Sequence, residues 1–93
     1  METTAKPLFV PLRREHFLAF ENGEKRAEWR RHGPRFNAGT CYAGRMMVLS
    51  LGYSGRRLLA RITNFSLELA KGPAAEIYGC DVECAVIHVE LIQ

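Results

Sequence analysis

The stretch Gly23-Glu24-Lys25-Arg26-Ala27-Glu28-Trp29-Arg30-Arg31 decides how this chain is organised. It follows a segment, residues 14–22, whose apolar side chains have the spacing of an amphipathic helix. Gly23 is a typical end for that helix, because glycine readily adopts the left-handed conformation found just beyond many helices. The residues after it alternate as in a strand. The sequence therefore predicts a helix over residues 14–22 followed directly by a strand over residues 25–31.

Three polar side chains with complementary chemistry fall at this joint. Glu28 and Arg30 are two residues apart and therefore share one face of the predicted strand. A carboxylate beside a guanidinium can orient a ligand through charge-assisted hydrogen bonds. Lys25, placed at the joint, can act as a base or nucleophile if burial removes its proton. We expect these three residues to line one concave site, with Lys25 at its mouth; the alternative is a surface lysine beside an ordinary ion pair.

The remaining patterns predict a small α+β domain. An apolar run over residues 8–12 contains a proline, which suits an edge strand. Residues 46–51 and 57–69 read as a hairpin, because the intervening Gly-Tyr-Ser-Gly has turn chemistry. Residues 82–92 alternate cleanly. A sheet with one apolar face and few helices tends to close on itself. The prediction is a mostly antiparallel, barrel-like sheet with one main helix near the N-terminus, covering one end.

Length and composition bound the broad class. Ninety-three residues make one small domain, which we place at residues 8–93 behind a flexible arm at residues 1–7. No apolar run approaches the roughly 18 residues that span a bilayer, so we expect no membrane association and a cytoplasmic location. The three cysteines, an odd number, argue against a disulfide framework. Cys80, Cys84 and His88 would align only on a helix, so we predict no metal and no cofactor.

Positive charge is concentrated around the joint. Residues 25–35 hold five basic residues against one acidic residue, whereas residues 46–93 hold four against five. Such a stripe is an electrostatic footprint for phosphate, although a solvated charged surface is the plain alternative. The candidate RNA-binding side chains are Arg26, Arg30, Arg31, Arg35 and Tyr53, the last at the predicted hairpin tip. We assign Trp29, the only tryptophan, to the core, with base stacking as the alternative.

With this order of elements, the chain resembles an ASCH domain of the PUA-like superfamily. The resemblance rests on the helix before Gly23, the pattern G-x-K-x-x-E-x-R over residues 23–30, Gly39 in a turn, and the hydrophobic hairpin. It covers about residues 8–69 well and is looser over the last third. It implies a PUA-like barrel that binds RNA or a modified nucleotide in a basic cleft beside the first helix.

One branch of small bacterial ASCH proteins hydrolyses N4-acetylcytidine, and others have been linked to RNA cleavage. The hydrolase branch uses the motif lysine, a threonine three residues later and a downstream glutamate. Lys25 matches the lysine, but Glu28 stands where the threonine would be. The downstream glutamate could be Glu68, Glu76 or Glu83, and the sequence does not choose among them.

Three functions follow as expectations. The first is a module that binds RNA or a nucleotide. The second is a small hydrolase of an acylated cytidine or of RNA, with Lys25 and Glu28 as catalytic residues. The third is a protein-interaction scaffold. The replaced threonine, the unassigned downstream acid and the basic stripe favour the first.

Overall fold

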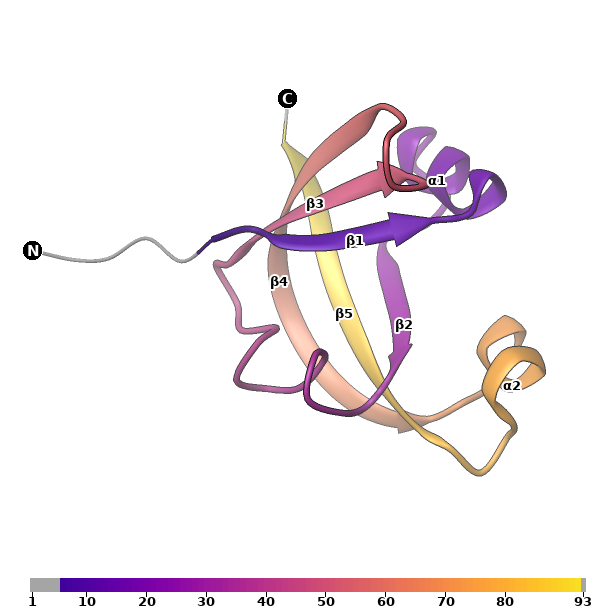
Figure 1. Cartoon of the computed structure of the whole chain (residues 1–93). Coiled ribbons are helices and arrows are strands. Elements are labelled where there is room, and N and C mark those ends of the chain that lie inside the picture. Colours follow the sequence, from indigo (N-terminus) through magenta and orange to yellow (C-terminus); the bar gives the residue numbers. More distant parts are fainter. Residues whose placement is uncertain (1–5, 93) are drawn as a thin grey trace, which may run out of the picture.

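The computed structural model describes residues 6–92, which form five strands and two short helices (Figure 1). In chain order they are β1 (Leu8–Leu12), α1 (Arg14–Glu21), β2 (Ala27–Arg31), β3 (Met46–Leu51), β4 (Arg57–Leu69), α2 (Pro73–Tyr78) and β5 (Glu83–Ile92). Residues 1–5 of the expected arm lie outside the described residues. No helix in the described part is long and apolar enough to cross a membrane.

The five strands form one mixed sheet in the order β1-β3-β4-β5-β2. The β1–β3 pairing is parallel, and the other three pairings are antiparallel. The sheet curls into a half-barrel (Figure 1), and among the described residues its two edge strands, β1 and β2, do not pair with each other. The sequence predicted the α+β class and the predominance of antiparallel pairs. It missed the parallel pair, because the connection from β1 to β3 runs through α1 and β2.

The long strand β4 forms the middle of the curl. Its first half pairs with β3, which confirms the predicted hairpin, and most of its length pairs with β5. The register with β5 shifts between Ile62 and Asn64. An extra residue of this kind bends a strand and increases its twist. The shift therefore contributes to the bending of β4 within the half-barrel.

The core lies on the concave face of the sheet. The aromatic rings of Phe17 and Phe20, contributed by α1, are almost completely buried there. From β5, Ala85, Ile87 and Val89 are also buried in the same cluster, at the alternating spacing of residues that share one face of a strand. A second, smaller cluster joins α2 to the other face through Ala70, Ala74 and Cys84.

Candidate functional site

A cleft of about 730 Å³ runs along the outer edge of β2. Figure 1 shows β2 between α1 and α2. One wall of the cleft comes from α2, and the other comes from the segment where β1 passes into α1. The charged and aromatic side chains of its lining include Arg13, His16, Lys25, Arg26, Glu28, Trp29, Arg30, Lys71 and Tyr78.

The end of α1 fixes the position of Lys25. Gly23 has a φ of 87°, a left-handed value that side chains other than glycine rarely tolerate. The chain turns there, and the Lys25 N–H donates to the Ala19 carbonyl at 3.0 Å. Strand β2 begins two residues later, at Ala27, so Lys25 lies in the turn and not within the strand as predicted. This turn aims the Lys25 side chain back toward α1 and the cleft.

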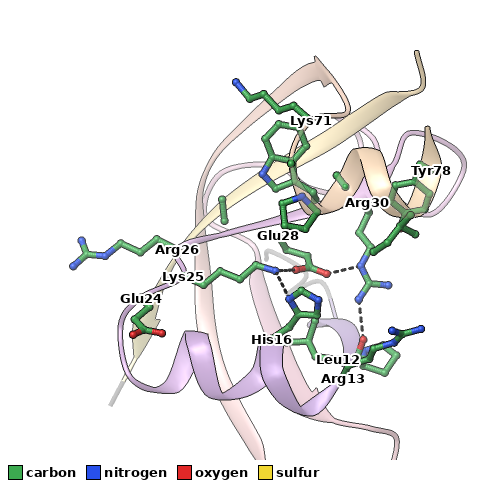
Figure 2. A pocket seen from close by; sticks show the side chains of 17 residues that line it. Leu12, Arg13, His16, Glu24, Lys25, Arg26, Glu28, Arg30, Lys71 and Tyr78 are labelled. Carbon is green, nitrogen blue, oxygen red and sulfur yellow. Dashed lines mark hydrogen bonds and ion pairs between the residues drawn. The ribbon is translucent and has the colours of Figure 1, made fainter. Parts of the chain in front are cut away.

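Glu28 is the buried anion of the cleft, only 5% exposed. Its Oε1 lies 2.8 Å from the Lys25 Nζ, and its Oε2 accepts a hydrogen bond from the Arg30 Nε at 2.7 Å. Figure 2 shows the two cations reaching the carboxylate from opposite sides. The lysine contact is an ion pair without good hydrogen-bond alignment, so Oε1 accepts no regular hydrogen bond from the described residues. Two cations around one carboxylate leave the cluster with a net positive charge.

Arg30 also connects the two edges of the half-barrel. Its Nη2 donates to the Pro11 carbonyl on β1 at 2.8 Å. The guanidinium lies 5.4 Å from the centre of the Phe36 ring, within the range of a cation–π contact. Glu28 therefore orients an arginine that joins β2 to β1, so this part of the cluster has a structural role whether or not it binds a ligand.

His16 is a member of the cluster that the sequence did not reveal. Its Nδ1 lies 3.3 Å from the Lys25 Nζ. The ammonium donates in this contact when the histidine is neutral, with its proton on Nε2. No residue near His16 in the sequence has the spacing of a partner, so local patterns do not assign it to the site. A signal was present: His16 and Phe20 are four residues apart and therefore share one face of the helix, and Lys25 also lies over the Phe20 ring, 5.2 Å from its centre.

Trp29 and Tyr78 supply the aromatic part of the cleft lining. Both side chains are half-buried and pack against the smaller apolar cluster under α2. The Lys71 ammonium lies 5.9 Å from the centre of the Trp29 ring. The assignment of Trp29 to the core is therefore correct only in part, because this side chain also faces the cleft. Tyr78 lies on the short helix α2, and no motif in the sequence marks it as a site residue.

The structure separates the predicted RNA-binding residues into two groups. Arg26 and Arg30 line the cleft, and so does Arg13, which was not predicted as a site residue. Arg26 and Arg13 project on opposite sides of the Glu28 cluster in Figure 2. Three predicted residues do not line it, namely Arg31, Arg35 and Tyr53. Arg35 packs over Phe36, and Tyr53, which is 77% exposed, lies beside Phe9.

The three downstream glutamates also lie outside the cleft lining. Glu68 pairs with Lys71, Glu83 pairs with His32, and Glu76 is exposed on α2. Among residues 6–92 no three His, Cys, Asp or Glu side chains are grouped so that they could hold a metal ion. The acids available within the cleft are Glu24 and Glu28.

The cysteines are all free thiols. Cys41 and Cys84 are buried, whereas Cys80 is exposed. Burial raises the pKa of the Cys84 thiol, and the nearby charge of Arg31 opposes this effect in part.

Comparison with models of known protein families gives no match for this sequence, and a search of curated proteins finds no significant match either.

Proposed function

We propose that the cleft binds one nucleotide unit of a single-stranded RNA or a modified nucleotide, with the base inside the cleft and the phosphate at its rim. The observation that carries this proposal is the buried Glu28 held between Lys25 and Arg30, within a cleft that has both aromatic and cationic walls. A buried polar cluster beside apolar surface is the usual composition of a small-molecule site.

The charges of the lining favour an anionic ligand. Lysine and arginine outnumber the two glutamates along the cleft. Glu28 is already paired with two cations, whereas neither Arg13 nor Arg26 has an ion-pair partner among the described residues. A guanidinium without a carboxylate partner is well suited to bind phosphate, because its donors match two phosphate oxygens. We assign Arg13 and Arg26 the phosphate contacts that the sequence had distributed over five residues.

The size and aromatic content of the cleft favour a nucleobase. Its volume of about 730 Å³ falls within the range of roughly 300–1,000 Å³ that is typical of small-ligand sites. Trp29 and Tyr78 both line it, and stacking of a base on an aromatic ring contributes about 1–3 kcal/mol without requiring a particular sequence. The curled sheet is in keeping with a PUA-like barrel of the ASCH type, and we include that relationship in the proposal.

A hydrolase is the second candidate, supported by the double contact of Lys25. Its ammonium touches both the Glu28 carboxylate and the His16 ring. A lysine held in this way is better placed to donate a hydrogen bond to a carbonyl oxygen than to attack the carbonyl carbon as a nucleophile. No downstream glutamate lines the cleft to assist, so we rank hydrolysis of N4-acetylcytidine second. Release of cytidine by the protein, lost in Lys25→Ala, would establish it; absence of cytidine would eliminate it.

The binding proposal is tested with a short fluorescein-labelled single-stranded RNA. Fluorescence anisotropy at several salt concentrations gives the slope of log K against log salt, and each phosphate contact contributes about −0.7 to that slope. We expect the double variant Arg13→Gln, Arg26→Gln to bind more weakly and to flatten the slope by about one unit. The matched control is Arg57→Gln, because Arg57 lies over Phe9 outside the cleft. Equal slopes for both variants would place the phosphate elsewhere, and no binding at low salt would leave the protein-interaction alternative.

A further inference from the structure

The main chain of β2 presents hydrogen-bonding groups toward the cleft. The Arg26 carbonyl accepts from the Val89 N–H at 2.9 Å, and the His32 N–H donates to the Glu83 carbonyl at 3.1 Å. Residues of an antiparallel strand direct their main-chain groups alternately toward the partner strand and away from it. Since Arg26 faces β5, the next residues to face the opposite way are Ala27 and Trp29.

These outward-facing groups have no partner in the described part of the chain. β2 is the last strand of the sheet order and pairs only with β5. Outside the pairing of β2 with β5, no main-chain or side-chain hydrogen bond among residues 6–92 reaches the N–H or C=O of Ala27 or Trp29. Both residues line the cleft. The Ala27 carbonyl and the Trp29 N–H thus form an acceptor and a donor, side by side on one edge of the strand, at the wall of the proposed site.

From this arrangement, and resting on the proposed nucleotide site, we propose that the free edge of β2 reads the base. The Ala27 carbonyl would accept a hydrogen bond from an exocyclic amino group, and the Trp29 N–H would donate one to the adjacent ring nitrogen. The ligand class is therefore a base with an amino group next to an unprotonated ring nitrogen, as in cytosine and adenine. The Glu28 carboxylate is buried and paired with two cations, Lys25 and Arg30, whereas the Ala27 carbonyl and the Trp29 N–H lie on the free edge of β2.

The length of the free edge favours a base over an added peptide strand. Within the cleft only Ala27 and Trp29 offer outward-facing groups, since Arg31 does not line it. A paired strand usually extends over at least three residues, and most are longer. A base needs only one donor and one acceptor. A nucleotide can also stack its base on the neighbouring aromatic side chains while its phosphate contacts the rim arginines. An extended peptide would not need both of these contacts.

This geometry discriminates against keto bases. Uracil and hypoxanthine place an oxygen where the amino group would be and a protonated nitrogen beside it. The Ala27 carbonyl would then face an acceptor, and the Trp29 N–H would face a donor. A two-bond base contact gives about 1–3 kcal/mol of discrimination, which corresponds to roughly a 5- to 150-fold difference in dissociation constant.

Pairs of nucleoside monophosphates that differ only at this edge test the inference. Because Trp29 is the only tryptophan and lines the cleft, its fluorescence reports occupancy directly. We expect CMP to bind at least about fivefold tighter than UMP, and AMP at least about fivefold tighter than IMP. N6,N6-dimethyl-AMP should bind as weakly as IMP. Binding of all these nucleotides with equal affinity would overturn the base-reading inference but keep the proposed function. Failure of all of them to bind would overturn both.

A variant separates reading by the main chain from reading by Glu28. Glu28→Gln changes the hydrogen-bonding character of the side chain and leaves the main chain of β2 in place. We expect the CMP-to-UMP affinity ratio to persist in this variant, even if both nucleotides bind less tightly. Loss of the ratio, with an unchanged circular dichroism spectrum, would show that the carboxylate reads the base and would refute the main-chain assignment. If the variant does not fold, the wild-type ratios alone decide.

Discussion

Replacing Glu28 with alanine should destabilise the protein far more than replacing any exposed glutamate. Glu28 is 5% exposed and forms ion pairs with both Lys25 and Arg30. Removing one partner of a buried ion pair costs about 3–5 kcal/mol, because the remaining charge stays buried without compensation. Here the two cations are 23% and 21% exposed, so they can partly turn toward water. We therefore expect Glu28→Ala to lower the free energy of unfolding by about 2–4 kcal/mol.

Glu28→Gln separates charge from shape. The amide oxygen can still accept from Arg30, so the expected loss is smaller, about 1–2 kcal/mol. The matched control is Glu90→Gln. Glu90 pairs with Arg61 at 3.4 Å, and their side chains are 57% and 50% exposed. An exposed pair of this kind contributes less than about 1 kcal/mol.

Urea unfolding followed by Trp29 fluorescence measures all three variants, because the midpoint and slope of the transition give the free energy of unfolding. The reasoning fails if Glu28→Ala and Glu90→Gln shift the midpoint equally, since the buried ion pairs of Glu28 would then stabilise the fold no more than the exposed pair does. It also fails if Glu28→Gln is more stable than the wild type, since the carboxylate charge would then oppose folding.

Three further results are expected. In the native protein a thiol reagent should modify Cys80 rapidly and Cys41 and Cys84 slowly, since only Cys80 is exposed; Cys80→Ser should remove the rapid phase. Because burial raises the pKa of Cys84, the unfolded chain loses this proton first as the pH rises. The free energy of unfolding should therefore fall as the pH rises above the ordinary thiol pKa of about 8.5. The fall should be less steep in Cys84→Ala, and urea unfolding midpoints measured across pH will show the difference. Tyr53→Ala should leave RNA affinity within about twofold, because this ring lies outside the cleft and is 77% exposed; anisotropy titration would reveal a larger loss.

Local patterns predicted much of the fold because their causes are local. Helix spacing and Gly23 located α1 to within a residue of its end. Alternation and turn chemistry located the β3–β4 hairpin and the buried face of β5. The parallel pairing of β1 with β3 was not predictable in this way, since it depends on where the chain returns after α1 and β2.

The candidate site shows the same division. Lys25, Glu28 and Arg30 were grouped from spacing along one segment, and the structure brings them together. His16 and Tyr78 reach the cleft from other elements, through tertiary packing that spacing does not describe. Arg31 and Arg35 were included because charge density along a sequence does not show which way each side chain points.

The pairing of β2 with β5 has a consequence for how the protein folds. Ala27 pairs with His88, and Arg31 pairs with Cys84, so the edge strand is held in place by a segment made much later in synthesis. Contacts between residues distant in sequence close large loops and generally form slowly. The β3–β4 hairpin can form while the chain is still being translated, but the cleft along β2 cannot exist until β5 has left the ribosome. A nascent chain would therefore lack the proposed nucleotide site until β5 has joined the sheet.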